Sequence, residues 1–406
     1  MIKKLLKNKE KNYLLLSQII IAFVGLVTGK IVAIYFIPKD FGFFNLQFAT
    51  YTFFFSLLIS PFIQYLKTVS KTFLPKIGYQ TFLYLAIFLI LIFYISFLLI
   101  HTINYGINYW LFLILSIMIP ANLMFSLISD YFNIQNRLNL FSLVNLIKNL
   151  GSFLFLGILF FINYKYSDGS IILWAVQVIG FLFGIILFMP HYKFNFSTIY
   201  KISFVKFSKK YFVYAWPLMI LAFWSWINNY FDRFAIEYYL DLKSVGIYNA
   251  NYAVGSKFFL LLNPFFLTLL IPNIYNNNEI KVRKASINKY VNLYTFVSIP
   301  ILILIYFLKD FIGLLLLSKS YESGFYLIFW IALAYFFLTV VFLYETIFYA
   351  ESKTKVILYS NIISAVLNIF LNVLLIPLYG LEGAFIATLV SFGIRFFVVQ
   401  YYYRKL

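Results

Sequence analysis

The chain has 406 residues, of which 63% are hydrophobic and only 11% are charged, and its formal net charge is +19. A soluble globular domain is typically about one quarter charged, so this composition excludes one and indicates an integral membrane protein. Cysteine is absent, which excludes disulfides, thiol catalysis and cysteine-based metal sites.

Apolar segments recur along the whole chain, and a membrane-spanning helix needs about 20 such residues. The first segment follows a basic stretch but lacks a small-residue cleavage site, so it is interpreted as an uncleaved span rather than a signal peptide. Breaks rich in Lys, Asn, Gly and Pro separate twelve predicted spans, at residues 13–37, 43–66, 81–100, 110–128, 138–161, 171–189, 211–240, 247–275, 291–308, 325–350, 356–378 and 384–402.

The spans predict an all-α membrane protein built from two six-helix halves. Residues 1–190 form the amino-terminal lobe, 191–210 a basic cytoplasmic linker, and 211–406 the carboxy-terminal lobe. Lys and Arg concentrate in alternate loops, which places both termini in the cytoplasm by the positive-inside rule. The positive net charge is mostly this orientation signal, so no nucleic-acid partner is expected.

A short internal repeat supports the two halves. The stretch "KIVAIYFIPKDFGFFNLQFA" begins at Lys30, and "RFAIEYYLDLKSVGIYNANYA" begins at Arg233. With one residue inserted, Gly42 aligns with Gly246 and Asn45 with Asn249. Six spans return the chain to the same side of the membrane, so the halves have parallel topology, and transporters bind substrates between such repeats.

Eight charged side chains fall inside the predicted spans. A charge at mid-bilayer costs at least about 2.5 kcal/mol, so these residues are expected to face protein or a water-filled cavity. The five cations, predicted to bind substrate, are Lys30, Lys148, Arg233, Lys257 and Arg395, and the three carboxylates, predicted to couple transport to an ion, are Asp232, Glu237 and Glu345.

Asparagines accompany these charges at helical spacing, and we expect the resulting polar strips to face a shared cavity. They are Asn145 and Asn149 beside Lys148, Asn228 and Asn229 beside Asp232, Ser391 beside Arg395, and Asn361, Asn368 and Asn372 in the eleventh span. Arg233 and Glu237 lie four residues apart and can pair along one helix face.

Simpler interpretations of these charges remain open. Lys30 and Lys257 can extend toward a membrane interface, the Arg233–Glu237 pair can be purely structural, and Glu345 can be solvated near the cytoplasmic side. His101 and His191 lie at span edges and are interpreted as interfacial residues. Without clustered ligands, no metal, cofactor or catalytic residue is predicted.

Three stretches resemble the polysaccharide flippases of the multidrug/oligosaccharidyl-lipid/polysaccharide (MOP) exporter superfamily, which also contains the MATE transporters. The longest is "YAWPLMILAFWSWINNYFDRFAIEYYLDLKSVGIYNANYAVGSK", from Tyr214 to Lys257. Its proline-initiated span ending in Asp-Arg, followed by "VGIY", is similar to the start of that family's second half. "IPKDFGFFNLQ" and "YGLEGAFIATLVSFGIRF" resemble its first outer loop and its last loop and span.

The resemblance implies a non-enzymatic transporter of the bacterial cytoplasmic membrane. Its substrate would be an oligosaccharide repeat unit linked to undecaprenyl pyrophosphate, such as an O-antigen unit, flipped from the inner to the outer leaflet by alternating access. Among the charges inside the spans, cations exceed carboxylates by two, which suits a pyrophosphate. H⁺ or Na⁺ antiport would supply the energy, no cofactor is needed, and polysaccharide polymerases are the expected partners.

Three other functions were weighed. A cation-coupled drug or metabolite antiporter of the same superfamily would need an acidic cavity, and the excess of cations opposes it. A membrane polymerase or ligase would need a long outer loop with polar catalytic residues, but the longest outer loop, "KDFIGLLLLSKSYESG", is short and mostly apolar. The third alternative is a flippase of peptidoglycan precursors. Such flippases usually have fourteen spans, whereas twelve are predicted here.

Overall fold

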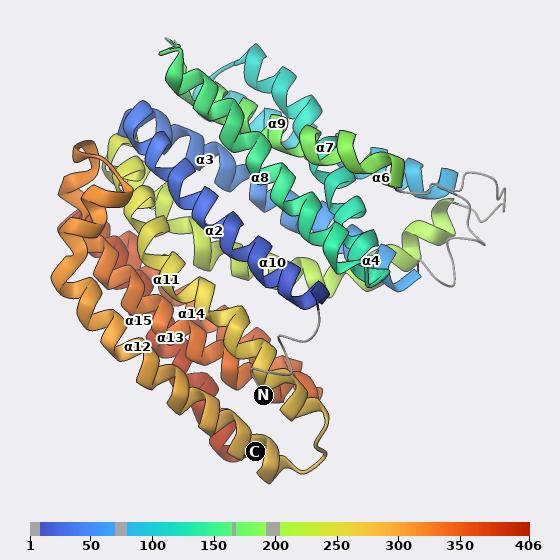
Figure 1. Ribbon diagram of the computed structural model, residues 1–406, viewed down its shortest axis with the longest axis vertical. Coiled ribbons are helices and arrows are strands. Elements are labelled where there is room, and N and C mark those ends of the chain that lie inside the picture. The colour runs from blue at the N-terminus through green and yellow to red at the C-terminus, as the bar shows by residue number, and fades with distance from the viewer. Residues whose placement is uncertain (1–8, 70–78, 165–167, 192–203) are drawn as a thin grey trace. The chain divides into compact units, whose positions relative to one another are not determined.

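The computed structural model describes residues 9–69, 79–164, 168–191 and 204–406 (Figure 1). Residues 1–8 and residues 192–203 of the predicted linker lie outside this description. All regular structure in the described ranges is helical, so the predicted all-α class is confirmed.

The helices of the first half of the chain are α2 (Lys9–Tyr35), α3 (Pro38–Phe54), η1 (Phe55–Ile59), α4 (Ser60–Val69), α6 (Tyr79–Tyr105), α7 (Tyr109–Ile134), α8 (Leu138–Phe161), α9 (Gly169–Phe188) and η2 (Met189–His191). Those of the second half are α10 (Phe204–Tyr239), α11 (Leu242–Tyr275), α12 (Ile280–Leu316), η3 (Lys319–Gly324), α13 (Tyr326–Ala350), α14 (Thr354–Tyr379) and α15 (Leu381–Lys405).

Short polar connections fix where several of these helices begin. The side-chain oxygen of Asn108 accepts a hydrogen bond from the backbone N–H of Leu111, 3.1 Å away, at the start of α7. Asp168 caps α9 and Asp241 caps α11 in the same way. Because the first N–H groups of a helix lack intrahelical partners, these side chains define the helix starts.

All twelve predicted spans coincide with described helices, but eleven helices have the length and apolar composition of a membrane span. The exception is α10, which covers the predicted seventh span. Its central section carries Trp216, Pro217, Trp224, Trp226 and Asn228, which make it less apolar than its neighbours. Most helices also extend beyond the predicted boundaries, as α12 does at both ends.

The chain forms two compact units. Unit 1 comprises residues 1–35 and 47–223, and unit 2 comprises residues 36–46 and 224–406. The boundaries fall inside α3 and α10, so the first residues of α3 belong to unit 2. The two lobes predicted from the sequence, residues 1–190 and 211–406, stay a prediction.

In unit 1, α8 packs against α2 and α9, and α9 also packs against α7. A buried polar group joins three of its helices: the indole N–H of Trp174 donates to Gln47 Oε1 over 2.8 Å, and the Gln47 amide nitrogen lies 3.3 Å from His101 Nε2. Because indole N–H only donates, the Gln47 amide must donate to His101. His101 is 3% exposed near the end of α6, and its interfacial position stays a prediction.

Unit 2 is built around α13, which packs against α11, α12 and α15. It is the most buried of the candidate spans, with aliphatic residues such as Leu327, Ile331 and Ile347 fully enclosed. A side chain carried by α13 is therefore surrounded by protein on most sides. This matters for Glu345, the one acidic residue of this helix.

The two segments of the predicted repeat contact each other within unit 2. Gly42 in α3 lies so close to α11 that a Cβ atom there would overlap the carbonyl oxygen of Leu242. A Cβ atom on Gly246 would likewise overlap the carbonyl oxygen of Pro38. One offset of 204 residues relates Gly42 to Gly246 and Pro38 to Leu242, and the same offset separates the hydrogen-bonded Asn45 and Asn249. The contact is therefore symmetric between the repeats.

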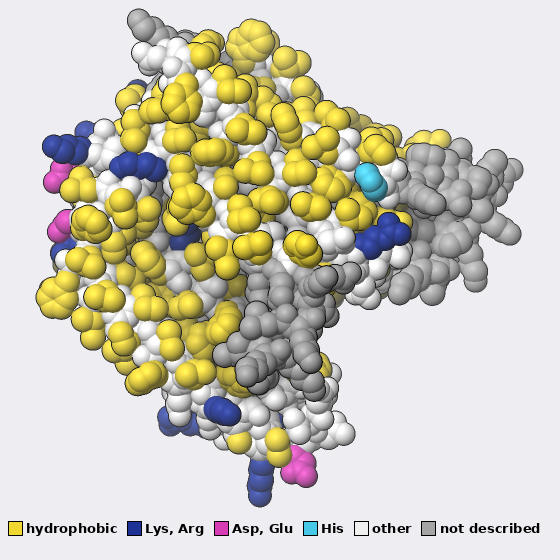
Figure 2. Space-filling model, in the orientation of Figure 1, with side chains coloured by type: hydrophobic (Ala, Val, Ile, Leu, Met, Phe, Trp, Pro, Cys, Tyr) yellow, Lys and Arg dark blue, Asp and Glu magenta, His cyan; other side chains and the backbone are white. Residues whose placement is uncertain are grey.

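Hydrophobic side chains cover most of the face seen in Figure 2, and Lys, Arg, Asp and Glu lie toward its margins. Large exposed residues such as Phe161, Phe296 and Phe307 have more than 70% of their surface accessible. Such a surface is expected of helices that face lipid.

The repeat contact predicts opposite effects for two glycine substitutions. Gly42→Ala should lower the thermal unfolding midpoint of the detergent-purified protein, because overpacking costs about 1–3 kcal/mol. The control is Gly25→Ala in α2, where nothing lies within 4 Å of the added Cβ. That substitution should leave the midpoint unchanged or raise it. Equal midpoints for both variants would contradict a close backbone approach at Gly42.

Candidate functional site

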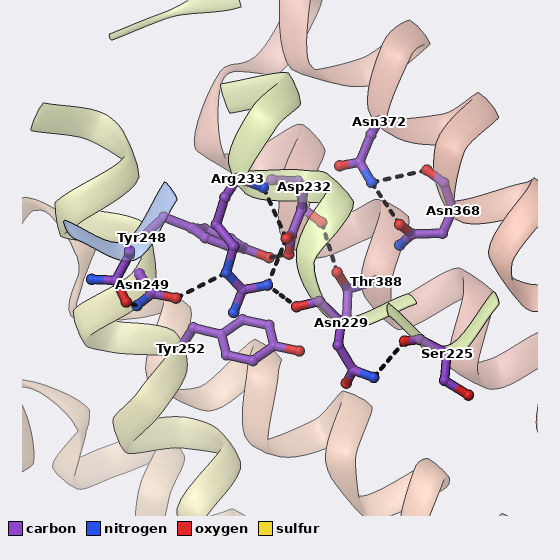
Figure 3. Close-up of polar contacts among 12 residues, drawn as sticks. Ser225, Asn229, Asp232, Arg233, Tyr248, Asn249, Tyr252, Asn368, Asn372 and Thr388 are labelled. Carbon is purple, nitrogen blue, oxygen red and sulfur yellow. Dashed lines mark hydrogen bonds and ion pairs between the residues drawn. The ribbon is translucent and has the colours of Figure 1, made fainter. Parts of the chain in front are cut away.

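The first polar cluster of unit 2 surrounds an ion pair at the end of α10 (Figure 3). Arg233 Nη1 lies 2.7 Å from Asp232 Oδ1, and Arg233 Nε donates to Asn249 Oδ1 over 3.0 Å. The hydroxyl of Tyr248 donates to Asp232 Oδ2 over 2.7 Å. We call Asp232, Arg233, Tyr248, Asn249 and Tyr252 the Asp232 cluster.

Aromatic rings enclose the Arg233 guanidinium. Its central carbon lies 4.6 Å from the ring centroid of Tyr252 and 5.0 Å from that of Tyr230. Cation–π attraction partly replaces water around a desolvated guanidinium. Arg233 is 5% exposed and Asp232 is 2% exposed, so the pair is buried as one neutral unit.

The ion partner of Arg233 is Asp232 rather than Glu237, the partner that helical spacing suggested. The reason lies in α11, which presents Tyr248 and Asn249 to the Asp232–Arg233 side of α10. Glu237 is half-buried, further along α10. Asn229 is also half-buried, and its backbone carbonyl accepts a hydrogen bond from Arg233 Nη1.

The second cluster, the Glu345 cluster, contains Glu345, Asn361, Ser364, Arg395 and Asn228. Arg395 Nη2 lies 2.9 Å from Glu345 Oε1, and its Nη1 donates to Asn361 Oδ1 over 3.1 Å. The Asn228 amide nitrogen donates to Asn361 Oδ1 over 2.9 Å, and the Ser364 hydroxyl donates to Asn228 Oδ1 over 2.9 Å.

Residues from three of the predicted polar strips are therefore in contact. Asn228 of α10 and Arg395 of α15 both form hydrogen bonds to Asn361 of α14 in the Glu345 cluster. Glu345 is only 3% exposed, so its predicted solvation near an interface is wrong. Burial of an unpaired carboxylate is strongly unfavourable, and Arg395 is the neighbour that neutralises it.

A buried asparagine pair lies further along α14. The amide nitrogen of Asn372 donates to the side-chain oxygen of Asn368, 3.0 Å away. Asn368 Nδ2 and Asn372 Oδ1 are fully buried and have no hydrogen-bond partner. Unpaired buried polar atoms cost about 1–3 kcal/mol each, so this pair is a polar site that packing alone does not explain.

In unit 1, aromatic rings frame Lys148. Its Nζ lies 4.3 Å from the ring centroid of Phe181 and 5.4 Å from that of Phe125. Its predicted neighbours are half-buried: Asn145 donates to Ser129 Oγ in α7 over 3.1 Å, and Asn149 donates to the carbonyl of Asn145. Lys30 in α2 and Lys257 in α11 are half-buried as well.

Charge is unevenly divided between the units. Among the eight predicted intramembrane charges, unit 2 contains three cations (Arg233, Lys257 and Arg395) and three carboxylates (Asp232, Glu237 and Glu345). The remaining two cations, Lys30 and Lys148, belong to unit 1. The two arginines of this set are paired with carboxylates, whereas no carboxylate among the described residues pairs with Lys148.

In the described part of the chain, no group of three His, Cys, Asp or Glu residues could hold a metal ion. The buried carboxylates are each occupied by an arginine.

Sequence reasoning missed the tyrosines and hydroxyls that complete the two clusters. Tyr248, Tyr252 and Ser364 gave no signal in a chain with 35 tyrosines and many serines. Asn249 did carry one, because the repeat aligned it with Asn45, and it now contacts both Arg233 and Asn45.

Comparisons with known proteins agree on one family. The profile described as "Polysaccharide biosynthesis protein" matches residues 9–278, and the profile described as "MatE" matches residues 255–374. No match was found among curated protein sequences.

Solved structures similar to this chain are transporters. The lipid II flippase MurJ in an inward closed conformation is 18% identical, with a TM-score of 0.73 over 96% of this chain and 87% of the other. An inward-facing multidrug resistance MATE family transporter of the MOP superfamily is 10% identical, with a TM-score of 0.67 over 95% and 94% of the chains. A MOP superfamily transporter from Pyrococcus furiosus is 9% identical, with a TM-score of 0.55 over 97% and 94%.

The Glu345–Arg395 pair predicts a strong asymmetry between single and double substitutions. Glu345→Leu alone leaves a buried guanidinium uncompensated and should destabilise the protein by about 3–5 kcal/mol. Combining it with Arg395→Met removes both charges and should restore most of the lost thermal stability. A double variant no more stable than Glu345→Leu would show that the two residues do not act as a pair.

Proposed function

Because this chain belongs to the polysaccharide biosynthesis protein family and has the fold of MOP superfamily transporters, we propose that it flips lipid-linked oligosaccharides across a membrane. The substrate we propose is an oligosaccharide repeat unit on undecaprenyl pyrophosphate, moved by alternating access for surface polysaccharide synthesis. The family and the fold are those of transporters and not of enzymes.

The charge of Lys148 is the observation that carries this proposal. A pyrophosphate is an anion and needs cations that resident carboxylates have not already neutralised. In unit 2 the arginines are held by Asp232 and Glu345. Lys148 is therefore the foremost proposed phosphate-binding residue, and Lys30, Arg233, Lys257 and Arg395 are further candidates.

The surroundings of Lys148 suit this role. An ammonium group has three N–H donors, and contact with the faces of two phenylalanine rings satisfies none of them as hydrogen bonds. Among the described residues, Lys148 Nζ has no carboxylate partner. The rings of Phe125 and Phe181 thus hold the ammonium in place while its donors stay available to phosphate oxygens.

The charge of the loops supports an orientation for the chain. Lys and Arg concentrate in alternate loops, which supports cytoplasmic termini. Movement from the inner to the outer leaflet and residence in the bacterial cytoplasmic membrane belong to the proposed role in supplying repeat units for surface polysaccharide synthesis. A polymerase that extends the flipped repeat units is the partner that such a product requires.

We also propose that transport is coupled to H⁺ or Na⁺ through the carboxylates of unit 2, Asp232 foremost, with Glu237 and Glu345 as further candidates. Asp232 and Glu345 each carry an arginine in this structure. A proton or cation can neutralise either carboxylate only by competing with that arginine. When an ion takes the place of the arginine on its carboxylate, the guanidinium must find another partner. The contact between the helices that carry these residues can then change.

A cation-coupled drug or metabolite antiporter is the second candidate, since MATE transporters share the fold. It would bind a cationic substrate, and the charge of Lys148 would repel one. Loss of the Lys148 charge therefore separates the two candidates, because it should impair export of an anionic lipid-linked glycan and favour export of a cation.

Lys148→Met tests the substrate proposal in proteoliposomes that contain a lipid-diphosphate-linked oligosaccharide. A hydrogen bond to a charged group contributes about 1.5–3 kcal/mol, so the rate at subsaturating substrate should fall roughly 10- to 100-fold. Lys148→Arg should retain most of the activity. Lys243→Ala changes an exposed lysine of α11 and serves as the control. A Lys148→Met protein that flips the substrate at the parental rate would contradict the proposal.

Asp232→Asn tests the coupling proposal in the same vesicles with an imposed proton or sodium gradient. The variant keeps the size of the side chain but cannot exchange a proton or hold a cation by charge. We expect flipping to lose its acceleration by the gradient, and Glu237→Gln identifies any share carried by the second carboxylate. Full gradient dependence in both variants would rule out coupling through this end of α10.

A further inference from the structure

A directional chain of hydrogen bonds connects the Asp232–Arg233 pair to the first turn of α3. Arg233 Nε donates to Asn249 Oδ1, and the Asn249 amide nitrogen donates to Asn45 Oδ1. The Asn45 amide nitrogen donates in turn to the carbonyl oxygen of Phe41 over 2.6 Å. These hydrogen bonds therefore connect a buried charge on α10, through a side chain of α11, to the backbone of α3.

The guanidinium fixes the direction of every link. Arginine only donates, so Asn249 must present its oxygen to Arg233 and its nitrogen to Asn45. Asn45 must then accept with its oxygen and turn its nitrogen to Phe41. Arg233 is itself fixed by Asp232, which accepts from both its Nη1 and its backbone N–H, 2.7 and 2.9 Å away. If Arg233 moves, Asn249 Oδ1 loses its donor, and on this path the Asn249 side chain keeps only its hydrogen bond to Asn45.

This series of hydrogen bonds ends at the contact between the two repeat segments. Asn45 and Asn249 are related by the same offset as Gly42 and Gly246, and they follow those glycines on α3 and α11. The glycines let two backbones meet but contribute no side chains to the contact. The asparagine hydrogen bond is thus a specific polar tie beside this backbone contact, where apolar residues such as Phe44, Leu46 and Ile247 are also buried. A neutral hydrogen bond contributes only about 0.5–1.5 kcal/mol, so this tie is easily broken.

We propose that Asn249 and Asn45 are positioning residues that transmit the charge state of the Asp232–Arg233 pair to α3. While Asp232 holds Arg233, the first turn of α3 is fastened to α11. When a proton or cation neutralises Asp232, Arg233 leaves its place, Asn249 loses the donor that holds its side chain, the hydrogen bond from Asn249 to Asn45 weakens, and the start of α3 is released from α11. The significance of this release rests on the proposed coupled transport, because α3 starts in unit 2 and continues into unit 1.

The absence of cysteine makes the contact measurable in the full chain. Lys39 and Lys243 are exposed, share the 204-residue offset, and directly follow the contact residues Pro38 and Leu242. A Lys39→Cys/Lys243→Cys protein can be spin-labelled at both positions, and dipolar EPR then reports the distance between α3 and α11. The parent should give one narrow, short distance. Adding Asp232→Asn or Asn249→Leu should reduce that peak and create a longer, broader population.

Matched controls separate transmission from general loosening. Glu345→Gln neutralises the other buried carboxylate of unit 2, and Asn228→Leu removes a buried asparagine of α10 from the Glu345 cluster. Both should leave the distance distribution unchanged, provided that circular dichroism shows folded protein for every variant. The proposal is overturned if Asp232→Asn and Asn249→Leu keep the parental distribution, or if the controls broaden it equally.

The measurement uses no substrate, so its outcome is independent of the transport assays. A protein that flips no oligosaccharide can still show the released population after Asp232→Asn. Conversely, a protein that flips the oligosaccharide but keeps the parental distance between positions 39 and 243 after Asp232→Asn would support the proposed function. It would also show that the hydrogen bonds through Asn249 and Asn45 take no part in the mechanism.

Discussion

Neutralisation of buried charge is the constraint on which the second half of this protein depends. Asp232 and Glu345 are both nearly inaccessible, and each is matched by an arginine within 3 Å. Asp232 and Arg233 are neighbours on α10, whereas Glu345 lies on α13 and Arg395 on α15. Because an unpaired charge in this environment is strongly unfavourable, the second pair keeps α13 and α15 together. The hydrogen bonds of α10, α11, α14 and α15 are organised around the two pairs.

The same constraint separates two roles that the cations would otherwise share. An arginine already held by a carboxylate contributes to stability and can respond to an ion, but it offers little net attraction to a phosphate. Lys148, framed by Phe125 and Phe181 in unit 1, carries positive charge without a resident counter-ion among the described residues. We therefore propose that Lys148 recognises the charge of the substrate and that the two ion pairs respond to the coupling ion.

Much of the fold was readable from the sequence because helix formation in lipid depends on length and apolar content. The predicted span at 138–161 coincides with α8, and the repeat anticipated the pairing of Gly42 with Gly246. The site was less predictable. Helical spacing suggested Glu237 as the partner of Arg233, but the partner is set by Tyr248 and Asn249 of another helix. Contacts with another helix cannot be predicted from residue spacing within one helix. In addition, the aromatic and polar residues of α10 lower its apolar content, and it is not among the helices with the composition of a membrane span.

The central claim is that the paired arginines and Lys148 have different roles, and a binding measurement tests it directly. The affinity for a labelled lipid-diphosphate oligosaccharide should be compared between the purified parent, the double variant Asp232→Leu/Arg233→Met and the variant Lys148→Met. If the roles differ as proposed, removing the neutral pair leaves the affinity close to that of the parent, whereas removing the Lys148 charge lowers it roughly 10- to 100-fold. The opposite order would contradict the proposal.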